Sequence, residues 1–433
     1  ARQSRFEPVL PRCAQITALT GAPLRTRPAT RATNRTRNRF GSWPSSGSPS
    51  RMSPAAVLGL YASGPALTLT HSADPERDVS PRIAETIGDM SQTIELGLDT
   101  FGDVTVGPDG RPLAQADVLR NVVEEAVLAD RLGLAFFGVG EHHRKDFSIS
   151  APEVVLGAVA GRTTQIHLGS SVTVLSTDDP VRVFERFSTV NAISNGRAEV
   201  IVGRGSFTES FPLFGYDMAH YEDLFEEKLQ LWAELVKGQP VTWAGRLRAP
   251  LSNQNVYPPS QTGTLHTWVA VGGSPESVVR AAHHGFPLML AIIGGNPQRF
   301  TGYTELYKQM LQRFGKPMLP IGVHSPGHVA ATDEQAREDL WPHYEGLMNR
   351  IGSERGWAPI GRAHFEREAG PDGALFVGSP ETVAAKITRT IKTLGLSRFD
   401  LKYANGTMPH DKLMTSIELY GTKVVPLVRQ DFD

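Results

Sequence analysis

Residues 134–144 read Leu-Ala-Phe-Phe-Gly-Val-Gly-Glu-His-His-Arg. The apolar start of this stretch predicts a buried β-strand, and the carboxylate of Glu141 and the imidazoles of His142 and His143 follow where the strand ends. In parallel α/β folds the carboxyl ends of the strands open onto the ligand crevice. Titratable groups there suit chemistry better than core packing, since an imidazole with a pKa of about 6.5 can move protons at neutral pH. The stretch therefore predicts an α/β enzyme with part of its active site at 141–143.

The order of segments around this stretch predicts a barrel. Strand-like segments rich in apolar residues fall at 94–99, 134–138, 166–174, 198–202, 267–271, 287–293, 320–325 and 398–403. Helical patterns lie between them, at 117–132, 151–161, 181–194, 221–237, 275–284, 297–314, 333–351 and 380–394. Such an alternation over about 340 residues is typical of a (β/α)8 TIM barrel. The alternative, an open doubly wound sheet, needs a Gly-x-Gly-x-x-Gly turn after its first strand, and the sequence lacks this fingerprint.

The composition is that of an ordinary globular enzyme, with 433 residues, 40% hydrophobic, 21% charged and a formal net charge of −1. A nearly neutral chain lacks the concentrated basic surface that nucleic acid or an anionic membrane requires of its main partner. The single cysteine, Cys13, excludes an intrachain disulfide and a cysteine metal cage, and it fits a reducing compartment. The longest apolar run, 287–293, is too short to span a bilayer. We therefore expect a soluble, cytoplasmic enzyme that acts on a small molecule.

Residues 1–89 differ in character from the rest of the chain. Ten arginines, no lysine and one acid, Glu7, occur in 1–51, without the periodicity of a folded element. Such a segment buries too little apolar surface to offset the entropy of ordering. We interpret 1–89 as a disordered or non-native N-terminal extension, with an organelle transit peptide as the alternative. The catalytic domain is then 90–433, for which Met90 is a suitable start.

Two glycine-containing turns predict anion binding. A Val-Ala-Val strand end runs into Gly272, Gly273 and Ser274 and then into a helix that begins Pro-Glu. Glycine lets backbone N–H groups approach phosphate oxygens, and a helix N-terminus favours an anion, although an ordinary capped turn is the alternative. The similar Gly-Ser-Pro-Glu at 378–381 is interpreted as a helix start. Arg204 lies between two glycines at the end of another strand, with room for a phosphate or carboxylate.

Other familiar chemistries find no support in the sequence. Adjacent His142 and His143 point to different sides of an extended loop, so they do not form the same-face pair that binds zinc, and we expect no metal site. The serine-hydrolase elbow, the Walker loop and an acidic metal cluster are missing from the sequence.

Five motifs in order, across about 94–428, resemble the bacterial luciferase-like family of flavin-dependent monooxygenases. These are Glu141-His142-His143, then Gly169-Ser-Ser-Val-Thr-Val-Leu-Ser, then Asp179-Pro-Val-Arg with Ile193-Ser-Asn-Gly-Arg, then Gly203-Arg-Gly, then Phe214-Gly-Tyr-Asp. The resemblance implies a (β/α)8 barrel that binds reduced flavin mononucleotide (FMN) at its strand ends, usually in a dimer, and we expect a homodimer.

The resemblance also implies roles for individual residues. His142 matches the catalytic histidine, which assists proton handling and stabilises the flavin peroxide formed with O2, and we place Glu141 beside it in the catalytic set. Ser171 and Val172 match the strand end that lies against the isoalloxazine ring, often through an unusual peptide geometry.

The flavin phosphate is expected at the two glycine-containing turns. Arg204 matches the phosphate arginine, and Gly272, Gly273 and Ser274 match the phosphate turn. The sequence departs from the pattern in two places, since Gly272 stands where the luciferase itself has a carboxylate and Glu222 stands where it has a second arginine.

The expected reaction is oxygenation of a small organic substrate by reduced FMN and O2. Electrons come from NAD(P)H, directly or through a separate flavin reductase. A long stretch at 340–376, interpreted as irregular, is expected to close over the site as a lid. The alternatives are a deazaflavin-dependent oxidoreductase, disfavoured because that branch usually has Asp-His in place of Glu-His-His, a non-catalytic flavin-binding protein, and a hydrolase that uses Glu141 and His142.

Overall fold

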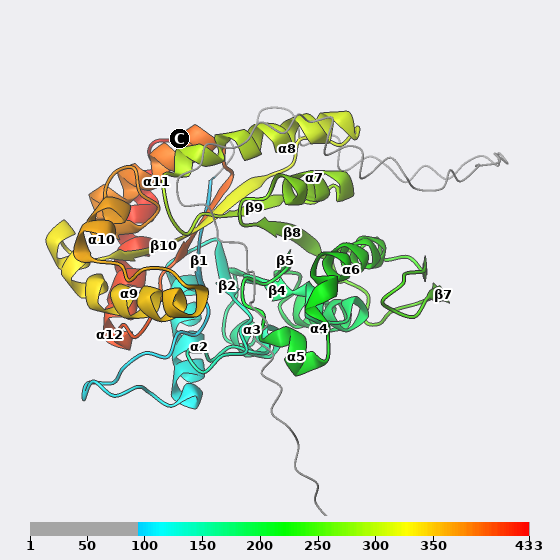
Figure 1. Ribbon diagram of the computed structural model, residues 1–433, viewed down its shortest axis with the longest axis horizontal. Coiled ribbons are helices and arrows are strands. Elements are labelled where there is room, and N and C mark those ends of the chain that lie inside the picture. Colours follow the sequence, from blue (N-terminus) through cyan, green and yellow to red (C-terminus); the bar gives the residue numbers. More distant parts are fainter. Residues whose placement is uncertain (1–93, 433) are drawn as a thin grey trace, which may run out of the picture. The chain divides into compact units, whose positions relative to one another are not determined.

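Eight parallel strands close into a barrel in the computed structural model, which describes residues 94–432 (Figure 1). Each barrel strand pairs with the barrel strands that come before and after it in the sequence. The last strand pairs with the first, with Glu95 opposite Arg398. The predicted (β/α)8 barrel is therefore confirmed, with all eight expected strands present. The strands are β1 (Glu95–Thr100), β2 (Phe136–Val139), β3 (His167–Ser170), β5 (Ala198–Gly203), β8 (His266–Val271), β9 (Leu288–Ala291), β10 (Ile321–Val329) and β12 (Arg398–Lys402). The interpretation of 1–89 lies outside the described residues.

Helices lie outside the strands, as Figure 1 shows, and carry the chain from each strand to the next. Ser274 and Ser379 cap two of them by accepting backbone N–H bonds, so the Gly-Ser-Pro-Glu copy at 378–381 is a helix start as predicted. No helix within 94–432 is both long and apolar enough to cross a membrane. The helices are α2 (Gln115–Arg131), α3 (Pro152–Ala160), α4 (Pro180–Ile193), α6 (Tyr221–Leu235), α7 (Pro275–His284), α8 (Thr301–Arg313), α9 (Asp333–Arg355), α11 (Pro380–Leu394) and α12 (His410–Leu419).

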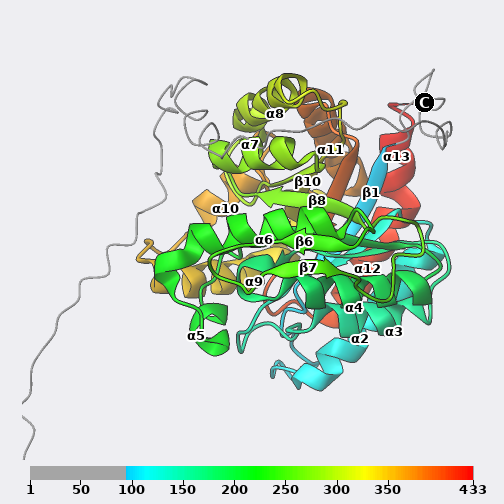
Figure 2. The same ribbon diagram turned by 90° about the vertical axis from the view of Figure 1, so that its right-hand side faces the viewer.

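Several short elements were not expected from the sequence. The hairpin β6 (Val241–Trp243) and β7 (Leu251–Gln254) lies beside α6 in Figure 2, β4 (Thr173–Val174) pairs with β5, and α5 (Ser210–Phe214) follows β5. The chain ends in a π-helical turn (Tyr420–Val424) and α13 (Val425–Arg429). Three-residue and four-residue 3-10 turns complete the list: Leu175–Thr177, Met218–His220 and Pro297–Phe300.

The interpretation of 340–376 as irregular was wrong. Helix α9 continues to Arg355, and α10 (Arg362–Ala369) and β11 (Phe376–Gly378) follow, with β11 paired to β10. The helix predicted at 333–351 covers most of α9, in spite of its internal Pro342, and the elements that were missed are short, with eight residues in α10 and three in β11.

The interior of the barrel contains buried charged side chains as well as apolar ones. The fully buried Arg398 bonds to Glu199 at 2.8 Å and to Asp400 at 3.0 Å, and its guanidinium lies 3.5 Å from the Phe136 ring centre. Only glycine fits at Gly97, because a Cβ there would lie 2.2 Å from a carboxylate oxygen of Asp400. Arg398 and Asp400 lie on the same strand, whereas Glu199 comes from β5 and meets Arg398 only when the barrel is closed.

Candidate functional site

Glu141 braces the loop that leaves β2. One carboxylate oxygen accepts a bond from the Val174 backbone N–H at 2.8 Å, and the other pairs with the His143 ring at 2.9 Å. The Glu141 N–H donates to the Val172 carbonyl, so the exits of β2 and β3 are tied together. The two histidines diverge as predicted, since His143 packs against Phe214 and His142 lies elsewhere.

His142 sits in an aromatic cage. Its ring lies 4.6 Å from Phe101, 4.6 Å from Phe147 and 5.2 Å from Phe207, measured between ring centres. The pKa of His142 is lowered to about 3, because burial disfavours the charged form and the nearby Lys402 adds positive charge. The imidazole is therefore neutral at pH 7, able to accept a hydrogen bond but unsuited to donating a proton as a cation.

The floor of the barrel mouth is apolar and made of small side chains. Val172 and Ala270 are half-buried and pack on a fully buried cluster of Phe136, Ile201, Trp268 and Met289. The Ser171–Val172 peptide bond is cis, in line with the unusual peptide geometry that the resemblance implies. Close approach across the floor requires glycine at Gly203, where a Cβ would lie 2.7 Å from Val172. Such a floor matches a flat, largely apolar ring system.

The 272–274 turn is open and its helix is well capped. Gly273 has a φ of 120°, and a Cβ there would meet nothing nearer than 3.9 Å, so the space beside this turn is free. Ser274 accepts the Ser277 N–H at 3.2 Å and donates its hydroxyl to Ser277 Oγ at 3.0 Å. Pro275 has no N–H, and the Ser277 N–H and the Ser274 hydroxyl are both used by the cap, so the anion site expected at this turn depends on the remaining backbone N–H groups of 272–276.

Arg204 is linked to this turn through a chain of polar contacts. Its guanidinium bonds to Glu222 at the start of α6, and the second oxygen of Glu222 lies 3.6 Å from Arg280 on α7. Arg280 is buried, pairs with Glu226 at 2.5 Å and bonds to Ser277. The predicted phosphate residues thus lie in one region, but the guanidinium of Arg204 is paired with the carboxylate of Glu222.

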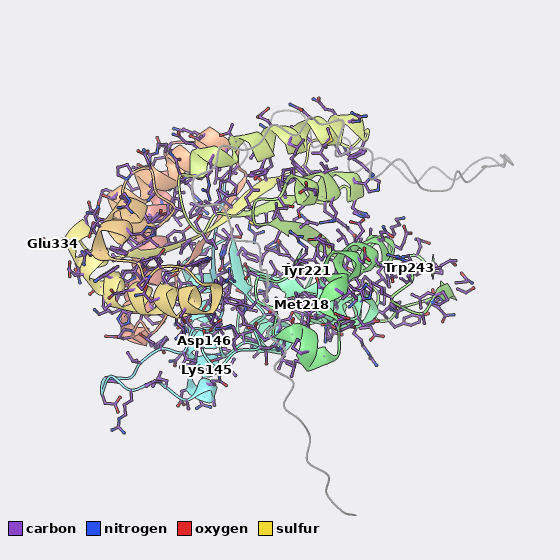
Figure 3. The ribbon with its side chains drawn as sticks, viewed as in Figure 1. Lys145, Asp146, Met218, Tyr221, Trp243 and Glu334 are labelled. Atoms are coloured by element: carbon purple, nitrogen blue, oxygen red, sulfur yellow. The ribbon has the colours of Figure 1, made fainter. Side chains whose placement is uncertain are left out.

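The C-terminal end of α9 closes one side of the mouth. Arg144 bonds to Glu354 through two N–H groups, at 2.9 and 2.6 Å, and Arg350 pairs with Asp146 at 3.2 Å. Figure 3 shows Asp146 beside this end of α9. Arg355 lies 5.0 Å from the centre of the Phe207 ring. The loop after β2 is therefore clamped to a helix more than two hundred residues away along the chain.

Several of these residues were missed by sequence reasoning. Phe101 follows the end of β1 just as Glu141 follows β2, so the strand-end argument could have found it. No local signal marks Phe147, Phe207 or Arg280, because each lies in a loop or on a helix whose position depends on the closed barrel.

The residues present fit an FMN-like group in outline. The apolar floor suits a flavin ring, and the open glycine turn at the start of α7 suits a phosphate. The Arg204–Glu222 pair opposes the phosphate, since the carboxylate must release the guanidinium first.

Comparison with known proteins bears on the family. The family model described as luciferase-like monooxygenase matches residues 101–398. An alkanal monooxygenase alpha chain from Photorhabdus luminescens is 24% identical over 370 residues, covering 76% of this chain and 97% of that protein. The oxygenating constituent of 3,6-diketocamphane monooxygenase from Pseudomonas putida, solved with FMN, has a TM-score of 0.63 at 18% identity, covering 77% of this chain and 98% of that one.

A structure titled as an F420-dependent secondary alcohol dehydrogenase has a TM-score of 0.60 at 17% identity, covering 78% of this chain and 99% of that one. At this identity the two structural similarities concern the fold alone. The match of the family model over most of the barrel, with the site geometry above, leads to one conclusion: the chain belongs to the luciferase-like monooxygenase family.

Proposed function

We propose that this protein is a flavin-dependent monooxygenase, in which reduced FMN at the barrel mouth and O2 oxygenate a small organic substrate through a flavin peroxide. The observation that carries the proposal is the meeting, at one barrel end, of the small-residue floor, the caged His142 and the open turn before α7. When bound, reduced FMN supplies the two electrons of the reaction.

The chain's own residues have separable tasks in this proposal. Val172 and Ala270 support the ring, and Ser171 holds the strand end that carries Val172. The neutral His142 accepts a hydrogen bond from the reacting group, while Glu141 positions it by bracing the loop. The phenylalanine cage keeps water away from the reacting oxygen.

The phosphate would be held by Gly272, Gly273 and Ser274 through backbone N–H groups, with Arg204 as the cation once Glu222 has released it. We also propose that NAD(P)H is the electron source, directly or through a separate reductase. The protein is proposed to form a homodimer and to act in the cytoplasm. The C-terminal end of α9 is the proposed lid, in place of an irregular loop.

An anaerobic titration tests the cofactor. Oxidised FMN, dithionite-reduced FMN and a reduced deazaflavin are each added to the full chain, and air is then admitted while visible spectra are recorded. Tighter binding of reduced FMN, with a transient peroxyflavin spectrum in air, supports the proposal. Binding of the deazaflavin alone would move the protein to the deazaflavin alternative, for which the F420-dependent dehydrogenase with the same fold is the precedent. Binding of neither would refute flavin dependence.

A further inference from the structure

A second imidazole lies in the barrel mouth, held by a buried carboxylate. His324 Nδ1 and Asp99 Oδ2 are 2.5 Å apart, although the two residues are 225 positions apart in the chain. Asp99 is the penultimate residue of β1 and His324 lies in β10, and β12 separates these strands in the sheet. A bond between the two side chains must therefore cross the barrel interior. Neither residue belongs to the set that the sequence motifs marked.

The orientation of His324 leaves one nitrogen free. Asp99 occupies Nδ1, and Nε2 makes no hydrogen bond to any residue within 94–432. The imidazole is 8% exposed, whereas Asp99 is fully buried and its second oxygen has no partner among the described residues. A carboxylate that holds one ring nitrogen of a histidine fixes the tautomer and orients the other nitrogen, as in catalytic triads.

His324 shares its surroundings with His142. The ring of Phe101 stacks on His324, with centres 6.0 Å apart and planes 19° apart, and meets His142 edge-on at 4.6 Å. The two imidazoles therefore flank one phenylalanine at the same barrel end. The charged groups around His324 are Asp99 on β1 and, on β12, Asp400, which is its register partner, and Lys402, whose Nζ lies 4.6 Å from the Phe101 ring centre.

We propose that the Asp99–His324 pair is the proton relay of the site, passing a proton from His324 Nε2 to the oxygen that leaves as peroxide or water. The inference rests on the proposed function. In the absence of substrate the balance is simple: reduced FMN gives two electrons and two protons, and O2 becomes H2O2. With substrate, one oxygen atom enters the product and the other leaves as water with both protons.

The alternative donor, His142, is poorly suited to the task. Burial in the cage disfavours its protonated form at neutral pH, two cations lie nearby, and no carboxylate within 94–432 contacts its ring. His324 has the carboxylate that His142 lacks. Division of labour follows: His142 accepts a hydrogen bond, and His324 moves the proton.

The test compares two variants of the pair with a matched His→Gln control on the strand that carries His324. His324→Gln and Asp99→Asn remove the relay, and His328→Gln is the control, since His328 is also buried on β10 but faces Asp339 of α9 at 3.8 Å. Anaerobic binding of reduced FMN is measured first, and then reoxidation by O2 and release of H2O2 from pH 6 to 9. We expect all three variants to bind reduced FMN. We expect reoxidation about a hundredfold slower in the two relay variants, a typical loss for general acid–base catalysis.

The pH profile and a flavin-free readout separate a relay from a structural pair. Reoxidation of the wild type and of His328→Gln should depend on pH in the same way, while reoxidation of the relay variants should be nearly independent of pH. In the 15N-labelled protein without flavin, a far-downfield ring N–H resonance should disappear in both relay variants and persist in the control. An unchanged profile with normal FMN binding, or no such resonance, overturns the relay. If the wild type binds no reduced FMN, the proposed function fails instead. If His324→Gln does not fold, the isosteric Asp99→Asn decides alone.

Discussion

Burial among three phenylalanine rings disfavours the charged form of His142. The pKa falls from about 6.5 in the unfolded chain to about 3 in the folded protein. Between these values the unfolded chain binds more protons, so this group stabilises the fold less as pH falls from 6.5 towards 3. The same burial that makes His142 a neutral hydrogen-bond acceptor therefore makes the protein sensitive to acid.

Urea unfolding at pH 7 and pH 5 checks this linkage. Between pH 7 and pH 5 the free energy of unfolding should fall by about 2 kcal/mol because of His142, since one pKa unit corresponds to about 1.4 kcal/mol. In His142→Gln the fall in the free energy of unfolding between the two pH values should be smaller than in the wild type by about that amount. The stability of the variant at pH 7 does not affect this comparison. The exposed His220→Gln serves as the control and should follow the wild type. Equal pH dependence in wild type and His142→Gln would show that the cage does not exclude the proton.

His142→Ala tests the proposed catalytic role at the same position. The folded chain should still bind reduced FMN, because the floor and the phosphate turn do not include this ring, while the peroxyflavin spectrum should decay more rapidly once the cage is open to water. Stopped-flow absorbance after mixing with O2 measures the decay. Loss of FMN binding with an intact fold would instead assign His142 to cofactor binding.

At the level of elements, the start of α6 competes with the phosphate. Glu222 lies in the first turn of α6 and pairs with Arg204, and it also approaches Arg280 on α7. A phosphate on the 272–274 turn would add negative charge beside this carboxylate. In the proposed function, the charge of Glu222 therefore opposes binding of the FMN phosphate.

Glu222→Gln should tighten FMN binding about fivefold, since an exposed ion pair is worth roughly 1 kcal/mol. Arg204→Gln should weaken it. Riboflavin, which has no phosphate, should bind all variants alike, and Asp223→Asn on the same helix turn controls for loss of a charge. Fluorescence quenching of the flavin gives the dissociation constants. A fivefold gain for riboflavin as well would exclude the phosphate as the cause.

In the proposed function, we expect the ion pairs between α9 and the loop after β2 to control how readily the mouth opens. Glu354→Gln keeps the shape of the side chain but removes the charge that pairs with Arg144. We expect faster hydrogen exchange at 350–357 and 142–147, by roughly 1 kcal/mol of local stability. Glu345→Gln on the same helix is the matched control, because Glu345 makes no ion pair within the described residues. If exchange is unchanged in Glu354→Gln, the clamp does not hold the proposed lid.

At the level of the whole molecule, closure of the barrel depends on residues from both ends of the described chain. β1 pairs with β2 on one side and with β12 on the other. The buried Arg398 then links β12 to Glu199 on β5 across the interior. Removing one partner of such a buried pair typically costs about 3–5 kcal/mol.

A chain that begins at Met90 should therefore unfold at the same temperature as the full chain, because every barrel strand lies within 94–432. A chain that begins at Phe101 lacks β1 and should not form the barrel, since β2 and β12 would be left as open edges. Circular dichroism during heating measures both. A lower midpoint for the chain from Met90 would show that 1–89 contribute to the stability of the domain.

The sequence by itself determined the architecture of this protein and pointed to the end of the barrel where we propose its active site. Strand and helix periodicity are local properties, so all eight strands could be predicted, and Glu141-His142-His143 marked the mouth because polar groups after an apolar run are rare in a core. Helix α9 was predicted as far as residue 351, whereas α10 and β11 after it were missed, because elements of eight and three residues are too short for periodicity to define.

Only the tertiary structure decided which side chains meet. The pairing of Asp99 with His324, the link from Arg204 through Glu222 to Arg280, and the cage around His142 each join positions on different elements. Their contacts depend on the register of the closed barrel and on where each loop returns, and no local pattern encodes either. The fold could therefore be predicted from the sequence. The contacts on which the proposed roles of these residues rest form only when the barrel closes.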